Sequence, residues 1–155
     1  MNSTAKLATI AALVHCAAFA AGEQPPVDLW TAKDLGARAS ALGAKMDAFK
    51  SANTPLGTRG NQTFLVAHRE GNGQAEWHEK QADIIVIMEG NVTVVYGGTI
   101  VNGKPTAAGE IRGDSITDGK QAQLGPGDIF HISPKVPHQM MVTGKLNYFV
   151  AKVDE

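Results

Sequence analysis

Two stretches of the sequence carry side chains of the kinds that bind metals and move protons. In the first, Glu76 and His78 are two residues apart, so on an extended strand both side chains leave the same face and can converge on one point. Asp83 follows after a short polar interval and opens an apolar run, residues 84–88, which predicts a buried strand ending at a Gly-Asn turn. In the second stretch, proline and glycine turns lead His138 onto another strand. We therefore expect carboxylates and an imidazole at the mouth of a hydrophobic hairpin.

Length, hydrophobicity and charge limit the functions that these residues can have. The chain has 155 residues, of which 43% are hydrophobic, and a formal charge of -1. These values predict one soluble globular domain, and a charge so close to zero gives no electrostatic basis for binding nucleic acid. The expected partner is a small-molecule ligand or substrate.

The N-terminal residues have the pattern of a secretory signal peptide. Lys6 precedes an apolar run, residues 7–21, and Ala18 and Ala20 occupy the minus-three and minus-one positions of a cleavage site after Ala20. The run is short for a transmembrane helix, and glycine and proline residues follow it. We expect residues 1–20 to be removed and the mature protein to be periplasmic or secreted, with no membrane attachment after cleavage.

The same segment contains Cys16, the only cysteine of the chain. An alternative interpretation is a lipoprotein anchored through Cys16, but His15 is bulkier than the small residue that lipoprotein processing favours before the cysteine. Cleavage after Ala20 leaves a chain with neither a disulfide nor a thiolate. Histidine, aspartate, glutamate and water then remain as the ligands available to a metal.

An amphipathic helix is predicted within residues 21–60, which we assign as linker and helix. Thr31 is the expected N-cap, and Asp34 lies three residues further on, at the capping-box position. Apolar residues then recur at spacings of three and four, as on one face of a helix, at Leu35, Ala39, Leu42, Met46 and Phe49. The helix is expected to end near Pro55. Its apolar face should pack on the body of the same chain or on a second copy.

From residue 61 the sequence changes to short apolar runs separated by Gly, Asn, Asp and Pro, which predicts an all-β domain over residues 61–155. Strands are expected near residues 63–68, 74–78, 83–89, 92–96, 99–101, 121–124, 128–133, 138–142 and 147–153. Many short strands at regular spacing favour a sandwich or barrel, with residues 102–120 as a loop inserted between two of them.

The two histidine-bearing stretches resemble the two sequence motifs of the cupins. The first motif is His-x-His, three or four residues, Glu, six residues and Gly, and the matching positions here are Glu76, His78, Asp83 and Gly90. The second motif is Gly, five residues, Pro-x-Gly, two residues and His, and the matching positions are Gly127, residues 133–135 and His138. Both spacings are kept.

Several residues depart from the cupin motifs. Glu76 replaces the first histidine, Asp83 replaces the glutamate, and Val142 replaces a final asparagine. Ser133 and Lys135 replace the Pro and Gly that flank the central position of the second motif. The resemblance covers residues 61–153, so the predicted helix precedes it as an added element.

The resemblance implies a conical β-barrel, or jelly roll, preceded by one amphipathic α-helix. It also implies a divalent metal held by Glu76, His78, Asp83 and His138, and a homodimer. Two imidazoles and two carboxylates, with room for water, suit Mn, Fe, Zn or Ni without choosing among them. Glutamate in place of histidine makes the site more negative by one charge, which lowers the Lewis acidity of a bound ion, and Asp83 is one methylene shorter than the usual ligand.

Two functions follow, and the sequence leaves both open. In the first, the protein is an exported metal-dependent enzyme, an isomerase, lyase or oxygenase, that acts on a small polar molecule and uses Glu76 or a neighbouring histidine to move a proton. In the second, it is a non-catalytic module that binds or senses a small molecule, with Glu76 and His78 as a hydrogen-bonded pair in a metal-free pocket.

The remaining polar clusters receive structural interpretations. His131 is expected to be a structural histidine on a strand, and residues 68–70 a solvated charge cluster where a strand enters a hairpin. Arg112 lies in a glycine-bounded loop, and it would be placed to bind a substrate carboxylate if that loop folded over the barrel mouth; a surface position is the preferred interpretation.

Overall fold

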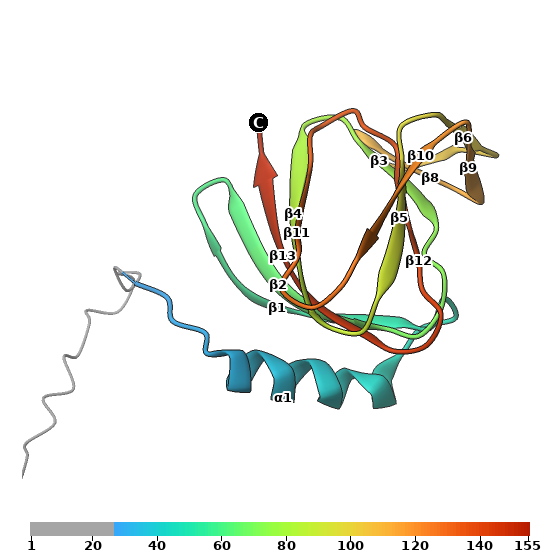
Figure 1. Cartoon of the computed structure of the whole chain (residues 1–155). Coiled ribbons are helices and arrows are strands. Elements are labelled where there is room, and N and C mark those ends of the chain that lie inside the picture. The colour runs from blue at the N-terminus through green and yellow to red at the C-terminus, as the bar shows by residue number, and fades with distance from the viewer. Residues whose placement is uncertain (1–26) are drawn as a thin grey trace, which may run out of the picture.

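The computed structural model describes residues 27–155, so the expected signal peptide at residues 1–20 lies outside the described residues. Two antiparallel sheets face each other across the interior and form a barrel with a jelly-roll arrangement (Figure 1). The predicted all-β cupin-type barrel, preceded by an amphipathic helix, is confirmed.

The first sheet has five strands in the order β1-β2-β13-β4-β11. Their bounds are β1 Ser51–Arg59, β2 Gln62–Arg69, β13 Leu146–Asp154, β4 Gln81–Glu89 and β11 Ile129–Ile132. The second sheet has six strands in the order β10-β5-β12-β3-β8-β7. Their bounds are β10 Lys120–Leu124, β5 Val92–Tyr96, β12 His138–Met141, β3 Ala75–His78, β8 Glu110–Gly113 and β7 Lys104–Ala107. A separate pair joins β6 Thr99–Val101 to β9 Ser115–Thr117.

The hydrophobic core fills the space between the two sheets, because alternate residues of each strand point inward. On β4, Ile85 and Ile87 are buried, and their cross-strand neighbours Val150 and Tyr148 on β13 lie beside them on the same inner face. Gly90 closes the turn from β4 to β5 with a φ of 86°, and a Cβ there would collide with the backbone carbonyl of Lys145. Only glycine accepts both conditions, which explains the glycine that ends the first motif.

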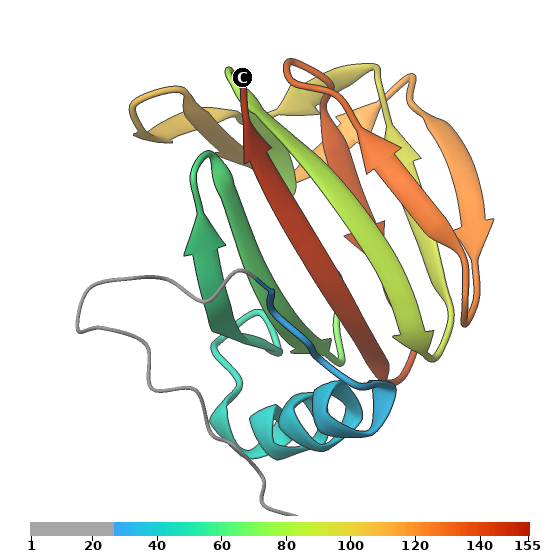
Figure 2. The same cartoon turned by 90° about the vertical axis from the view of Figure 1, so that its left-hand side faces the viewer.

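The helix α1, Ala32–Leu42, lies against the outer side of the five-stranded sheet and crosses one end of it (Figure 2). Its predicted N-cap is confirmed, since Thr31 Oγ1 accepts a hydrogen bond from the Asp34 amide at 3.1 Å. Ala39 and Leu42 are buried against Val66 of β2. The apolar stripe thus packs on the body of the same chain.

The helix is shorter than expected. A 3₁₀ turn, Gly43–Lys45, follows it, and the Asp47 carboxylate accepts hydrogen bonds from the amides of Phe49 and Ser51, which turns the chain into β1. Phe49 therefore leaves the helical stripe. The first sheet begins at Ser51, within the range assigned to the linker, because β1 pairs with β2 over its whole length despite Pro55 and Gly57.

The expected loop at residues 102–120 contains β7, β8 and β9, which were not predicted. All three are three or four residues long, and β7 is exposed along its length, so they lack an apolar signal. The strand β8 nevertheless pairs with β3 over four residues and brings this segment to the motif residues.

Among residues 27–155, no helix is long and apolar enough to span a membrane.

Candidate metal centre

The pairing of β3 places the motif residues between two neighbouring strands. Glu76 lies opposite His138 of β12 on one side and opposite Arg112 of β8 on the other. His78, two residues along the same strand, lies opposite Glu110 of β8. The prediction that Glu76 and His78 share one face of an extended strand is met, because β3 is extended from Ala75 to His78.

Four ligand-type side chains point at one small region. The Nε2 atom of His78 lies 3.7 Å from Glu76 Oε2 and 3.6 Å from Asp83 Oδ2. The Nε2 atom of His138 lies 3.9 Å and 3.7 Å from the same two oxygens. The two imidazole rings are 5.3 Å apart, so histidines that are 60 positions apart in the sequence do meet inside the barrel.

The other nitrogen of each imidazole is already engaged. His138 Nδ1 donates to the Val136 carbonyl at 3.0 Å, and since a carbonyl only accepts, Nε2 of the neutral ring carries the lone pair. His78 Nδ1 lies 2.6 Å from Glu110 Oε2, which fixes that ring in the same way. His78 Nε2 is buried and has no hydrogen-bond partner within residues 27–155. A metal ion would supply the partner that this buried nitrogen lacks, so the residues fit a metal site.

Each carboxylate also touches a cation. Arg112 forms an ion pair with Glu76 Oε1, which leaves Oε2 toward the imidazoles. On β13, Lys152 Nζ lies 2.8 Å and 3.1 Å from the two oxygens of Asp83, its cross-strand neighbour on β4. Arg112 was expected at the surface, and the structure overturns this because β8 places it beside Glu76.

Glu76, His78 and His138 form a group whose ligand atoms lie within 4.8 Å of one another. Asp83 reaches the same region despite its shorter side chain, but its carboxylate is bound by Lys152. Asp83 as a fourth metal ligand therefore stays a prediction.

The pKa values in the cluster follow from burial and charge. Burial lowers the pKa of His138. Burial also acts to lower the pKa of His78, but Asp83 and Glu110 outweigh it and raise that pKa above 6.5. At 3.6 Å the contact from Asp83 is too long for a hydrogen bond, so Asp83 acts on His78 mainly through its charge. Although burial opposes the charge of Asp83, His78 and Lys152 lower its pKa to about 2.

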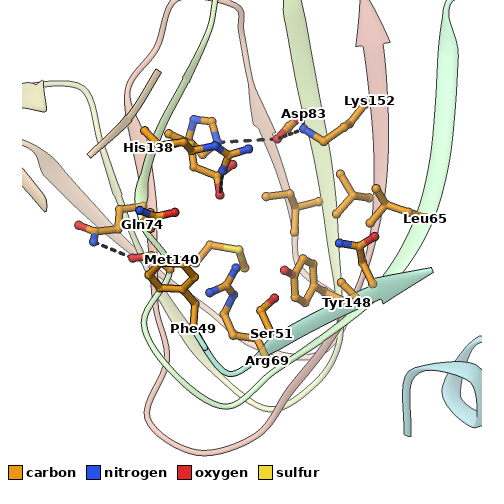
Figure 3. A pocket seen from close by; sticks show the side chains of 18 of the residues that line it. Phe49, Ser51, Leu65, Arg69, Gln74, Asp83, His138, Met140, Tyr148 and Lys152 are labelled. Carbon is orange, nitrogen blue, oxygen red and sulfur yellow. Dashed lines mark hydrogen bonds and ion pairs between the residues drawn. The ribbon is translucent and has the colours of Figure 1, made fainter. Parts of the chain in front are cut away.

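A cavity of about 290 Å³ lies beside the cluster inside the barrel (Figure 3). Glu76, Asp83 and His138 line it together with Lys152 and Arg112. The remaining lining is partly apolar, from residues such as Leu65, Ile85, Met140 and Val150. The volume suits a small molecule, at the lower end of the usual range for ligand sites.

The structure corrects the interpretation of residues 68–70 and locates His131 away from the cluster. The segment at residues 68–70 was expected to be a solvated charge cluster, but His68 is 1% exposed and Arg69 is 8% exposed. His68 packs under the helix and its Nδ1 lies 2.6 Å from Asn147 Oδ1. His131 is on β11, exposed and outside the cluster.

Sequence reasoning missed Glu110, Lys152, Arg69 and Tyr148 as residues of this region. A signal for three of them was present as period-two alternation. Leu65, Ala67 and Arg69 share one face of β2, and Tyr148, Val150 and Lys152 share one face of β13; all six line the cavity.

Comparison with known proteins identifies the fold through structure alone. No protein-family model matches the sequence. No curated protein matches it either. A recombinant oxalate oxidase in complex with glycolate superposes with a TM-score of 0.53 and 16% identity, over 76% of this chain and 57% of that chain. KdgF from Halomonas sp. superposes with a TM-score of 0.50 and 11% identity, over 68% of this chain and 82% of that one.

At these identities the likeness shows the fold and not the activity. The structural neighbours are cupin-fold proteins, and this chain has the fold of a small cupin.

Proposed function

We propose that this chain is an exported, metal-binding cupin that acts on a small polar molecule in its barrel, as an isomerase, lyase or oxygenase. The single observation that supports this most is the buried, unpartnered Nε2 of His78. It faces the same region as His138 Nε2, while the second nitrogen of each ring is already occupied. We further propose that the mature protein is a homodimer in the periplasm or outside the cell.

The proposed ligands of a divalent metal are Glu76, His78 and His138, with Asp83 as a fourth. A bound ion would supply a Lewis acid that polarises an oxygen of the substrate. The chain itself supplies the rest of the chemistry. Glu76 is the group assigned to proton transfer, because Arg112 holds one of its oxygens and its carboxylate lines the cavity. Burial raises the pKa of Tyr148, so its hydroxyl stays protonated beside the cavity and can donate a hydrogen bond to a ligand.

The experiment is a calorimetric titration of chelator-stripped protein with Mn, Fe(II), Zn and Ni. The wild type should bind at least one of them, and His78→Ala and His138→Ala should each abolish that binding. His131→Ala is the matched control, because His131 is an exposed strand histidine outside the cluster. If the wild type binds none of the ions better than the two cluster variants do, the metal centre is refuted.

A metal-free binding module is the second candidate, and one observation favours it. Glu76 and Asp83 are already paired with Arg112 and Lys152, so the two carboxylates have counter-charges without any ion. Elemental analysis of protein purified from its native compartment separates the candidates, since the enzyme should carry close to one equivalent of metal and the module none.

A further inference from the structure

Arg69, the last residue of β2, carries a charge into the barrel without an opposite charge beside it. Its side chain lines the cavity and is only 8% exposed. Its Nε and Nη1 atoms are buried and make no hydrogen bond within residues 27–155. In Figure 3 its guanidinium lies between Met140 and Tyr148, below the cluster of His138 and Asp83.

The other two cations that line the cavity each have a carboxylate partner. Arg112 is paired with Glu76 and Lys152 with Asp83. No carboxylate of residues 27–155 forms such an ion pair with Arg69. The Tyr148 hydroxyl is hydrogen-bonded to the side chains of Arg69 and Ser51. Burying a guanidinium without an anion is unfavourable, so this side chain is kept at a cost in stability.

The position of Arg69 is also fixed by its surroundings. Gly73 packs so closely that a Cβ there would lie 3.2 Å from Arg69 Nη1 and 3.4 Å from the Met140 carbonyl oxygen. The guanidinium is therefore held in place before any ligand arrives, which lowers the entropy that binding costs.

We propose that Arg69 binds the carboxylate of the cavity's ligand, so that the ligand is a small organic acid whose other end reaches the Glu76, His78 and His138 group. This inference deepens the proposed function. It rests on the proposed function only for the contact between the other end of the acid and the Glu76, His78 and His138 group. A carboxylate fits better than a phosphate for two reasons. Its single charge matches one guanidinium, and the other two cations that line the cavity already hold Glu76 and Asp83.

The first test uses the wild-type protein, both chelator-stripped and loaded with the ion that it binds best. Thermal-shift and calorimetric titrations compare two- to six-carbon mono- and dicarboxylates with their own neutral amides, and include inorganic phosphate. At least one acid should bind about 10-fold or more tightly than its amide, because the amide loses a charge-assisted hydrogen bond. The proposal is overturned if no acid in the series exceeds its amide, or if phosphate binds more tightly than every acid.

The second test removes the charge. Arg69→Met should weaken binding of the best acid about 10-fold or more, while Arg38→Met, at an exposed position on α1, should leave it unchanged. The melting temperature of ligand-free Arg69→Met should equal or exceed that of the wild type, because an unpaired buried cation has been removed. A purely structural arginine would instead lower it. Undiminished acid binding by Arg69→Met would overturn the assignment.

Arg69→Lys provides the charge-retaining variant and serves if Arg69→Met fails to fold. It should keep the preference for acid over amide and bind more weakly than the wild type, because an ammonium cannot form the two parallel hydrogen bonds of a guanidinium. Binding equal to that of the wild type would count against Arg69. The measurements on chelator-stripped protein make the result independent of the metal centre. Selective acid binding without any metal binding would refute the metal centre and leave the role of Arg69 standing.

Discussion

Replacing Lys152 with methionine should destabilise the metal-free protein and make metal binding more stabilising. Lys152 is the cation that holds both oxygens of Asp83, whose side chain is 6% exposed. In the variant a buried carboxylate loses its ion-pair partner. The same carboxylate becomes available to an ion between His78 and His138, whose Nε2 atoms lie 3.6 Å and 3.7 Å from it.

The size of the loss follows from the pKa of Asp83. The folded protein lowers this pKa from 3.8 to about 2, which corresponds to about 2 kcal/mol in favour of the charged form at neutral pH. His78 contributes part of that, but without Lys152 the penalty for burying the carboxylate is no longer offset. Lys152 is itself 22% exposed, so part of its charge is already solvated. We expect a loss of about 2–3 kcal/mol, at or below the lower end for broken buried ion pairs.

Urea denaturation at pH 7, with and without a saturating divalent ion, measures both effects. The ion should raise the unfolding free energy of Lys152→Met by more than that of the wild type. Lys145→Met is the matched control, because Lys145 is 46% exposed and pairs with Glu89 at 3.4 Å on the surface, so it should change stability by less than about 1 kcal/mol. Equal ion-induced stabilisation of Lys152→Met and the wild type would refute Asp83 as a potential ligand.

Three further outcomes are expected. Leu42→Asp should cost about 3 kcal/mol or more in urea denaturation, because Leu42 is 6% exposed on the face of the helix that packs against β2. Ala41→Asp, on the exposed face of the helix, should be nearly neutral, and equal effects of the two variants would show that the stripe does not pack as described. Metal affinity measured by calorimetry should fall on acidification, and a flat profile would exclude imidazole ligands. The raised pKa of His78 means that its proton stabilises the metal-free fold below about pH 6.5 and that this contribution disappears as pH rises through the raised value, where an ion replaces the proton. Mass spectrometry of protein from the native host should find an N-terminus within a residue or two of Ala21, and an intact Met1 would remove the basis for export.

The fold was predictable because its strongest signals are local. Apolar alternation located the long strands, and the 92–96 and 99–101 ranges match β5 and β6 residue for residue. The Thr31 cap located the start of the helix. The end of the helix was misplaced because Met46 and Phe49 keep the three- and four-residue spacing of the apolar stripe. The turn that ends the segment depends on hydrogen bonds to the Asp47 side chain, which the spacing does not reveal. Strand β1 lacks alternation and contains proline and glycine, so only its pairing with β2 reveals it.

The candidate site was predictable only where spacing alone specifies it. Glu76 and His78 converge because two residues on a strand share a face, and the second motif supplies His138. Glu110 and Arg112 come from a short strand whose charged, apolar, charged pattern is compatible with a surface loop. Arg69 follows His68 and precedes Glu70, so its sequence neighbours suggest solvent. Its period-two spacing from Leu65 and Ala67 places the three on one face of a strand, but only the pairing of β2 shows that this face lines the cavity.

The charges around the cavity link the metal centre to the ligand. Glutamate in place of histidine was expected to make the site more negative by one charge, but Arg112 and Lys152 each pair with one carboxylate, and Arg69 has no carboxylate partner within residues 27–155. A divalent ion therefore adds two positive charges to a region in which one guanidinium is already without a counter-charge. An organic acid on Arg69 would offset part of this positive charge, so the ion and the acid should each tighten the binding of the other. Linkage requires the same factor in both directions, and titrating each ligand in the presence of the other measures it. Independent binding of ion and acid would show that the two do not share this cavity.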